Sequence, residues 1–423
     1  MSESTRKKVS AGLARRRRKE RVFRTTGLLA TTVGIVFLVV FFVDLIGKGS
    51  SAFRQTFVNL EVNFDAAIVA PDGSVDLQYA DFDALARNAL RGLFPEVSGR
   101  GPLRELNQLL SVGAGYQLRD MLVENPDLLG MTQSVWLPAS SNVDMLQKGN
   151  IDASIDASLR TISDAQLAWI DALQRTGRLE LHWNRAFFTN GDSREPELAG
   201  IRGALVGSFY MLLVTLVLAL PIGVAAAIYL EEFAPRNRWS DLIEVNINNL
   251  AAVPSIVFGL LGLAVFINWA ALPRSAPLVG GLVLSLLTLP VIIISSRAAI
   301  KAVPPSIRNA ALGLGASRMQ VVFHHVMPLS LPGMLTGAII GMSRALGESA
   351  PLLMIGMVAF IVDVPAGLSD PATALPVQIY LWADSPERAF AERTSAAIMV
   401  LLGFLMLMNL VAVVLRKRME QKW

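Results

Sequence analysis

The chain has 423 residues, of which 53% are hydrophobic and 17% are charged, and its mean hydropathy is +0.48. This composition is too apolar for a soluble domain of such length and indicates an integral membrane protein. Cysteine is absent and histidine occurs only three times, which excludes disulfides, thiol nucleophiles and thiolate metal sites, and we predict no metal site.

The N-terminus is basic, with five consecutive Arg and Lys residues at 15–19, and an apolar run follows at residues 27–47. We predict a basic cytoplasmic segment at 1–26 and a first transmembrane helix at 27–47, because about 20 residues at about 1.5 Å each cross a bilayer. The alternative is a cleaved signal peptide. Its apolar part is usually about 7–15 residues long and ends at a small-residue cleavage site, which this run lacks.

Residues 48–198 form an acidic stretch between apolar segments. It carries 13 basic and 20 acidic side chains, a net charge of −7, whereas the rest of the chain carries +11. Its length predicts a domain rather than a loop. Apolar spacing at 81–93 and a capping box from Ser163 to Gln166 predict helices. No catalytic motif is visible, so we expect an inserted, mainly helical extracytoplasmic domain that serves docking or packing.

Residues 199–423 hold the remaining apolar segments. Runs long enough to span a membrane lie at residues 204–230, 247–271, 278–300, 331–362 and 395–415. The predicted fold is therefore an all-α membrane protein with six transmembrane helices, one before the inserted domain and five after it.

The charge pattern orients these six spans. An even number places both termini on one side, and both are basic, the C-terminal one through Arg416, Lys417, Arg418 and Lys422. Lys301, Arg308 and Arg318 make one connection basic as well, so the rule that cytoplasmic loops carry excess positive charge predicts that these segments are cytoplasmic. Because the basic residues flank apolar runs, we expect a multi-pass membrane protein in contact with lipid and no nucleic-acid binding.

The cytoplasmic connection at 301–328 has the pattern of a helical elbow. Small residues at Ala310 and Ala311, a turn at Gly315 and a second helix ending before Pro328 predict two short helices that project from the membrane. The chain contains no Gly-x-x-x-x-Gly-Lys-Ser/Thr stretch, so no P-loop for ATP is present.

The fifth predicted span combines small residues with a charge pair. Gly333, Gly337 and Gly341 recur every fourth residue and predict close packing against another helix. Arg344 and Glu348 are spaced i, i+4, which places them on one helical face. A charge within an apolar span must face a partner or a water-filled path, and Arg is suited to binding an oxyanion. A purely structural ion pair is the alternative.

Residues 308–328 resemble the EAA loop of bacterial ABC-importer permeases, the cytoplasmic loop that receives the motion of the ATPase. Ala310, Ala311, Gly315 and Pro328 match the pattern in register, whereas Asn309 stands where the family has Glu. The resemblance assigns ATPase coupling to these five residues.

Residues 343–353 closely resemble the signature of the PstA-type permeases of bacterial phosphate ABC importers, with Ser349 in place of Thr. Further matching stretches lie at 221–230, 253–260, 375–380 and 408–410. The resemblance implies the type I importer permease fold, an inner-membrane location and inorganic phosphate as substrate, with Arg344 and Glu348 on its path. Two departures are Ile294 and Arg297, which stand where the family often has Arg and an acidic residue.

The implied partners are a homologous permease that forms a heterodimer with this chain, two copies of an ATPase and an extracytoplasmic phosphate-binding protein. ATP and magnesium would be used by the ATPase, so we expect this chain to bind no cofactor and to contain no catalytic residue. Two alternatives stay open: a permease for another oxyanion or an organophosphate, and a phosphate-sensing signalling membrane protein. A membrane enzyme is disfavoured because the spans hold no paired carboxylates and no nucleophile–base set.

Overall fold

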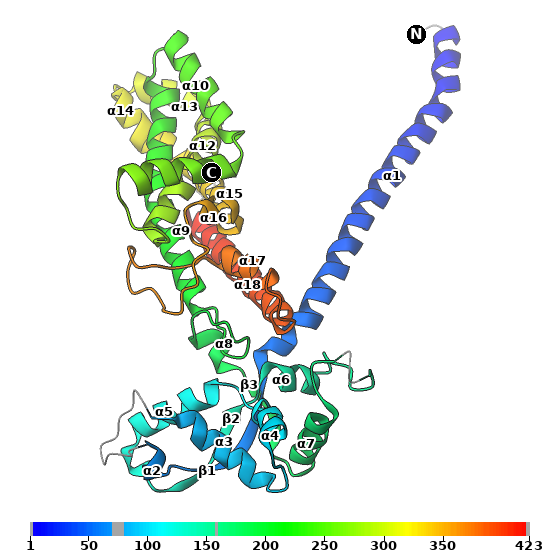
Figure 1. The fold of residues 1–423 in the computed structure, drawn as a ribbon. Helices are drawn as coiled ribbons and strands as arrows, with labels where there is room; N and C mark the ends of the chain where they lie inside the picture. Colours follow the sequence, from blue (N-terminus) through cyan, green and yellow to red (C-terminus); the bar gives the residue numbers. More distant parts are fainter. Residues whose placement is uncertain (1–2, 70–79, 157–159, 420–423) are drawn as a thin grey trace.

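The computed structural model describes residues 3–69, 80–156 and 160–419, and Lys422 of the basic C-terminus lies outside them. The described chain forms a long N-terminal helix, a small unit that contains a sheet, and a helical bundle (Figure 1). In this part of the chain, five helical stretches are long and apolar enough to cross a membrane: Arg16–Phe53, Arg202–Phe233, Pro277–Lys301, Arg318–Gly347 and Ala389–Met419. The predicted helical membrane fold is therefore confirmed, with the addition of one small sheet outside these helices.

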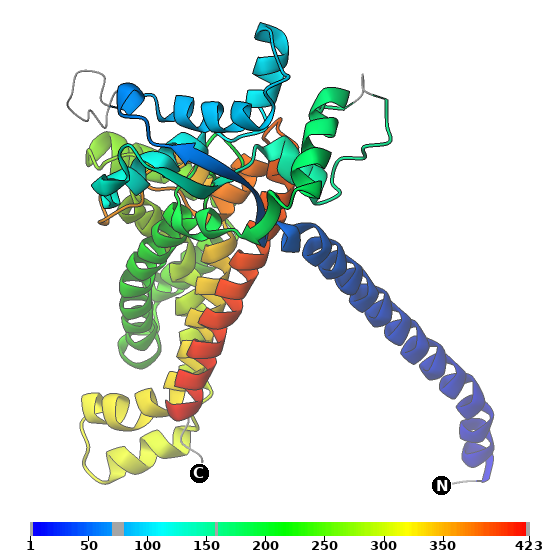
Figure 2. The ribbon, with the colours of Figure 1, turned by 90° about the horizontal axis from the view of Figure 1, so that it is seen from below.

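Helix α1 (Glu3–Gly49) contains the whole apolar run predicted as the first span. It diverges from the bundle along most of its length and meets it near Gly49 (Figure 2). A Cβ at Gly49 would lie 2.9 Å from the backbone nitrogen of Ala396 in α18 (Ala389–Met419), so glycine permits this close approach. The remaining apolar surface of α1 is exposed and is suited to lipid or to another helix.

A three-stranded antiparallel sheet follows directly after α1 and the short turn η1 (Ser50–Phe53). Its order is β2-β1-β3, with β1 at Arg54–Asn63, β2 at Thr132–Pro138 and β3 at Leu179–Trp183. Val58, Leu60 and Val62 alternate along β1 and are fully buried, which is the period expected for a strand with one covered face. The sequence prediction of a mainly helical domain did not include this sheet.

Short helices surround the sheet and build the rest of this unit, which we call the outer unit (residues 50–189). They are α2 (Ala66–Val69), α3 (Phe82–Leu93), α4 (Arg100–Asn107), α5 (Gly113–Glu124), η2 (Pro126–Leu128), α6 (Ser141–Gln147), α7 (Asp164–Arg175) and α8 (Arg185–Thr189). The two helices predicted from sequence are confirmed: α3 begins after the N-cap Asp81, and α7 begins with the capping box of Ser163 and Gln166.

The bundle is built around α12 (Pro277–Lys301), the most buried of the membrane-length helices. It packs against α9 (Arg202–Ile228), which continues into the π-helical turn η4 (Tyr229–Phe233), and against α15 (Met327–Gly347). Helix α18 (Ala389–Met419) packs on α1, α15 and the short α17 (Leu375–Ala383). The predicted spans at 204–230, 278–300 and 395–415 are each found as one helix.

The predicted span at 247–271 is broken, which corrects the sequence analysis. Helix α10 (Arg238–Ala251) is followed by α11 (Ser255–Gly262) and the π-helical η5 (Leu263–Trp269), and the two parts are bent by 100°. Pro254 explains the break, because it has no N–H to donate and disfavours the helical conformation at the residue before it. Hydropathy alone cannot detect such a bend.

The predicted continuous span at 331–362 is also wrong. Helix α15 ends at Gly347, Glu348 has an extended backbone with φ −82° and ψ 118°, and a separate short helix α16 (Ala350–Met354) follows. In the other direction the helix extends beyond the prediction, because α14 (Arg318–Val321), the π turn η6 (Val322–Val326) and α15 run on without interruption.

The elbow formed by α13 (Pro305–Gly313) and α14 lies at the end of the molecule far from the outer unit. Figure 2 shows that both chain ends lie at this same end. This arrangement agrees with an even number of crossings, with the bent α10–α11 pair counted as one of six.

Candidate functional site: the break after α15 and the elbow

Arg344 and Glu348 lie at the end of α15 rather than deep inside a continuous span. Arg344 is in its last turn and Glu348 is its C-cap residue. Arg344 Nε is 3.4 Å from Glu348 Oε1, and their side chains are 45% and 20% exposed. Because Glu348 is extended, the pair forms across the helix end and not along a helical face, which corrects the expected geometry. A partly exposed arginine with a long contact to its carboxylate stays available to another anion.

The neighbours of Arg344 fix its turn of helix on two sides. Ser343 Oγ donates a hydrogen bond of 2.7 Å to Asn409 Oδ1 of α18. Ala345 and Leu346 are buried in the apolar core that includes residues of α9 and α12. The turn is therefore anchored to the bundle while the Arg344 side chain remains half exposed.

The helical segments that follow two breaks contact each other close to this pair in the chain. A Cβ at Gly259 of α11 would lie 2.7 Å from Pro351 Cα of α16, so the segment after the first break touches the segment after the second. Non-helical backbone at membrane depth is tolerated where it is buried in protein or lines a polar path.

The small residues of α15 pack against α12, as the sequence predicts. A Cβ on Gly333 would lie 2.6 Å from Ala299 Cβ, and a Cβ on Gly337 would lie 2.4 Å from Ser295 Cβ. Gly341 has ordinary space, with Thr288 and Ile292 at 3.7 Å. The predicted close-packing face of α15 is confirmed.

The five residues assigned to ATPase coupling lie in the elbow and at its junction with α15. Asn309 and Ala310 are exposed on α13, whereas Ala311 is buried against the apolar base of the elbow. Gly315 makes the turn with φ +87°, a conformation that favours glycine. Pro328 does not end the second helix as expected: the helix continues through it, and the preceding π turn accommodates a residue that cannot donate a backbone hydrogen bond.

Ion pairs that the sequence analysis missed hold this end of the bundle together. Arg308 Nη2 is 2.8 Å from Glu232 Oε1 and also donates to the carbonyl oxygen of Ile300 at 2.8 Å. Arg297 pairs with Glu231 at 2.5 Å and with Glu244 at 2.7 Å. Arg297 is thus engaged by two carboxylates and is not a free cation for a substrate. Ile294, the other departure from the family pattern, is 37% exposed.

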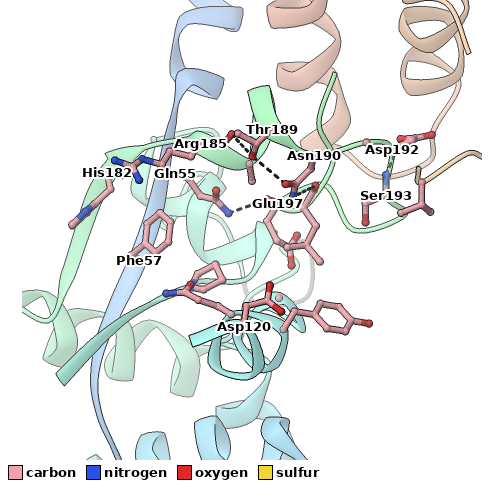
Figure 3. Close-up of a pocket in the computed structure, with 18 of the residues that line it drawn as sticks. Gln55, Phe57, Asp120, His182, Arg185, Thr189, Asn190, Asp192, Ser193 and Glu197 are labelled. Carbon is pink, nitrogen blue, oxygen red and sulfur yellow. Dashed lines mark hydrogen bonds between the residues drawn. The ribbon is translucent and has the colours of Figure 1, made fainter. Parts of the chain in front are cut away.

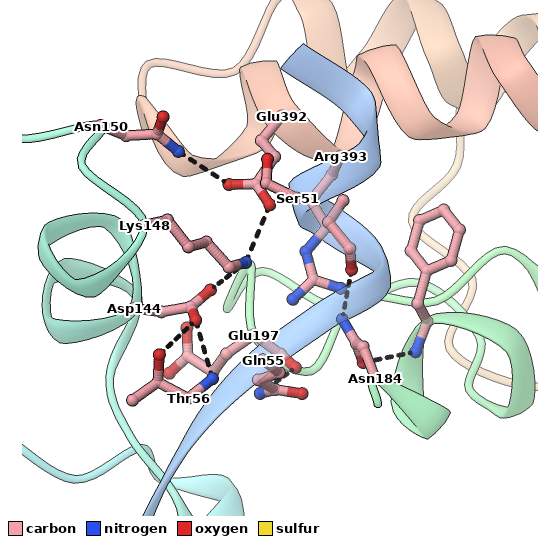
Figure 4. A network of polar contacts seen from close by, with 12 residues as sticks. Ser51, Gln55, Thr56, Asp144, Lys148, Asn150, Asn184, Glu197, Glu392 and Arg393 are labelled. Carbon is pink, nitrogen blue, oxygen red and sulfur yellow. Dashed lines mark hydrogen bonds and ion pairs between the residues drawn. The ribbon is translucent and has the colours of Figure 1, made fainter. Parts of the chain in front are cut away.

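A second group of buried charges joins the outer unit to the bundle (Figure 4). Lys148 Nζ lies 2.6 Å from Asp144 Oδ2 and 2.8 Å from Glu392 Oε1 of α18. Asn150 Nδ2 donates to the other oxygen of Glu392 at 3.1 Å, and Asp144 Oδ1 accepts two hydrogen bonds from Thr56. Asp144 and Lys148 have the local spacing i, i+4, but Thr56 and Glu392 are far from them in sequence, so no local pattern could have linked the whole group.

A cleft of about 1080 Å³ lies between the outer unit and the loop that carries Phe360 and Val362. Figure 3 shows Gln55, Asp120 and Arg185 around it. The described part of its lining includes four carboxyl groups, from Asp120, Glu124, Asp192 and Glu197, and one Arg or Lys side chain, that of Arg185. Burial raises the pKa of Asp192 and Glu197 above the ordinary values. With four acidic groups against one arginine, these lining residues provide no excess of positive charge to attract an anion.

Comparison with known families divides the chain in two. Residues 202–422 match the family described as binding-protein-dependent transport system inner membrane component. Residues 10–157 match a family described as a domain of unknown function, DUF3333. The first match includes α9 to α18, and the second includes most of α1 and the first two strands of the outer unit.

Curated relatives align with part of the chain. A probable ABC transporter permease protein YqgI of Bacillus subtilis is 37% identical over 168 residues, which are 40% of this chain and 56% of that protein. The phosphate transport system permease protein PstA 1 of Mycobacterium tuberculosis is 31% identical over 222 residues, 52% of this chain and 72% of that protein. PstA of Haemophilus influenzae is 30% identical over 199 residues, 47% and 69% of the two chains.

Among solved structures, an inward-facing MetNI methionine ABC transporter superposes with a TM-score of 0.43 at 18% identity, covering 52% of this chain and 96% of that chain.

Proposed function

The chain belongs to the family of binding-protein-dependent transport system inner membrane components, and from that membership we propose that it forms one half of the membrane path of an ATP-driven importer of inorganic phosphate. It is a multi-pass transport subunit. The phosphate assignment is supported by the relatives named as phosphate transport permeases. The observation that carries it is Arg344, a half-exposed cation held at the break after α15.

Arg344 would supply transient charge compensation to phosphate. Its guanidinium can donate two charge-assisted hydrogen bonds to an oxyanion without losing its proton. Only its Nε is engaged, by Glu348 at 3.4 Å, and its two terminal nitrogens have no hydrogen-bond partner among the described residues. Glu348 would hold the Arg344 side chain in position while no anion is bound. When an anion arrives, Glu348 would compete with it for the guanidinium group, and this competition keeps anion binding weak enough for release.

The elbow would receive the motion of a separate ATPase that uses ATP and magnesium. Its exposed surface, with Asn309, Ala310 and Leu314, projects from the end of the bundle. Arg308 ties α13 to η4 and to the end of α12, so a push on the elbow would reach α9 and α12 directly. We propose that a homologous permease completes the path, that two ATPase copies dock on the elbows, and that an extracytoplasmic binding protein delivers phosphate.

The proposed orientation in the bacterial inner membrane places the elbow and both termini in the cytoplasm. They lie at one end of the molecule (Figure 2), and this end carries Lys301, Arg318 and the basic last turn of α18, which holds Arg416, Lys417 and Arg418. The outer unit at the opposite end would be extracytoplasmic.

The test is ATP-dependent uptake of radiolabelled phosphate into proteoliposomes that contain this chain with its partner permease, ATPase and binding protein. Arg344→Ala should lower uptake by roughly ten- to a hundredfold, because hydrogen bonds to charged groups contribute about 1.5–3 kcal/mol each. Arg344→Lys should restore part of it, since the charge returns without the planar fork.

Arg175→Ala is the matched control, because Arg175 is an exposed arginine of the outer unit that pairs only with Asp171. It should leave uptake unchanged. Competition with sulfate, molybdate and phosphonates separates phosphate from other oxyanions. Normal uptake by a correctly assembled Arg344→Ala complex would refute the role of Arg344, and ATP hydrolysis without any phosphate uptake in the wild type would refute the substrate.

A further inference from the structure

A positively charged cavity lies within the outer unit, outside the transport path. It has a volume of about 510 Å³ and lies between α3, α4 and the start of α5. Its lining includes two arginines from α3, Arg87 and Arg91, and two from α4, Arg100 and Arg104. Among the described residues that line it, Asp83 is the only one with a carboxyl group.

The local sequence explains why the four arginines converge. Each pair is spaced i, i+4, so its members lie one helical turn apart on the same face. The chain enters α4 through Gly99, whose φ of +93° favours glycine. On the third side, a Cβ on Gly115 of α5 would clash with Asp83 Oδ1, so glycine lets α5 close the cavity against α3.

Most of this positive charge has no partner. Arg87 is bound by Asp81, with Nη2 at 2.9 and 3.0 Å from the two carboxylate oxygens. Among the described residues, no side-chain hydrogen bond or ion pair is found for Arg91, Arg100 or Arg104. Arg91 Nε is also buried without a hydrogen-bond partner. Arg100 and Arg104 are exposed and Arg91 is partly buried, so an anion can reach the cluster from solvent, and the cluster keeps its positive charge because arginines stay protonated in proteins.

Two neighbours fit the same interpretation. Asn107 Oδ1 lines the cavity and is buried without a partner, which leaves an acceptor for a protonated phosphate oxygen. Burial raises the pKa of Asp83 above the ordinary aspartate value, which weakens its opposition to a bound anion.

We propose that this cavity is a binding site for a phosphate-class oxyanion, either inorganic phosphate or a phosphate monoester. Guanidinium groups recognise such anions through paired, charge-assisted hydrogen bonds. The site is separate from Arg344, because α3 and α4 lie beside the sheet at the end of the molecule opposite the elbow (Figure 1). It gives the outer unit a ligand of the same class as the proposed cargo and makes it a sensor of that anion outside the membrane.

The test is equilibrium binding of radiolabelled inorganic phosphate to the purified full chain in detergent, without partner subunits or ATP. The double variant Arg91→Gln/Arg104→Gln should weaken saturable binding at least tenfold. Arg175→Gln, which removes an exposed arginine of the same unit, should leave it unchanged. Arg104→Lys should bind with intermediate affinity, and this single variant keeps the test decisive should the double variant fail to fold.

Competition identifies the source of the anion. If only unlabelled inorganic phosphate displaces the radiolabelled phosphate, the cavity is a site for free phosphate. If a short-chain phosphatidic acid displaces it more strongly, the natural ligand is a lipid headgroup. Both outcomes support the proposed chemistry. Equal displacement by chloride would overturn it, as would phosphate binding that persists in the folded double variant and disappears only in Arg344→Ala. Because no transport is measured, failure here leaves the proposed importer function untouched.

Discussion

Glu197 shows how one buried carboxyl sets a dependence on pH. It is 3% exposed at the junction of the outer unit and the bundle, and its Oε2 has no hydrogen-bond partner. Burial raises its pKa, an effect that contacts with Ser111 and the charge of Arg393 only partly oppose. Between the ordinary glutamate pKa and this raised value, the folded chain binds a proton that the unfolded chain has released. Stability therefore falls as pH rises through that window and stays lower above it.

Glu197→Gln should remove this decrease in stability with rising pH. We expect the variant to unfold a few degrees above the wild type at pH 7.5 and close to it at pH 4, as measured by thermal unfolding of the purified chain in detergent. Glu96→Gln, an exposed carboxylate of the same unit, is the control and should follow the wild type at both values. The same pH dependence in wild type and Glu197→Gln would show that the buried carboxyl is not responsible.

At the scale of elements, the close contact between α15 and α12 depends on a glycine, Gly337. Gly337→Ala would place a Cβ 2.4 Å from Ser295 Cβ, so the two helices must shift. Overpacking of this kind costs about 1–3 kcal/mol. Gly341→Ala is a matched control on the same helix, because its new Cβ meets atoms only at 3.7 Å. We expect Gly337→Ala, but not Gly341→Ala, to lower the unfolding temperature and to reduce phosphate uptake. Equal stability of the two variants would contradict this packing argument.

Hydropathy and spacing predicted the elements that depend on neighbouring residues in the chain. The spans at α9, α12 and α18, the capping box at Ser163 and the close-packing face of α15 all follow from local pattern. The breaks do not, because an apolar run looks the same whether the helix bends at Pro254 or continues through Pro328. The backbone outcome depends on whether surrounding helices hold the freed groups, which sequence spacing does not encode.

The same dependence on tertiary structure explains which features of the candidate site could be predicted from the sequence. Arg344 and Glu348 were found because their spacing is local, yet their geometry was misjudged because the end of α15 at Gly347 was not foreseen. The partners of Arg297 and Arg308 come from η4 and α10, more than 50 positions away in the chain. Such pairs become visible only when tertiary structure brings the elements together.

At the scale of the whole molecule, the outer unit and the bundle are joined by Lys148. Its side chain is only 3% exposed and lies between Asp144 of α6 and Glu392 of α18, which are 8% and 9% exposed. Helix α18 also holds the turn of Arg344 through Asn409. A rigid joint at Lys148 would therefore connect an anion-sensing outer unit to the helix that positions the transport site.

Lys148→Met tests this joint, because it removes the lysine that bridges two buried carboxylates and leaves only the buried Arg393 to offset their charge among the described residues. Removing one partner of a buried pair costs about 3–5 kcal/mol. We expect faster hydrogen exchange at residues 141–147 and 389–397, measured by mass spectrometry on the full chain. Lys148→Met/Glu392→Gln should recover part of the protection, since only Asp144 then stays charged and Thr56 still donates to it. Arg119→Gln, which breaks an exposed pair with Asp120, should change neither segment.

Unchanged exchange in Lys148→Met would mean that apolar contacts alone hold the outer unit on the bundle, and a signal from the anion cavity would then need another route to Arg344.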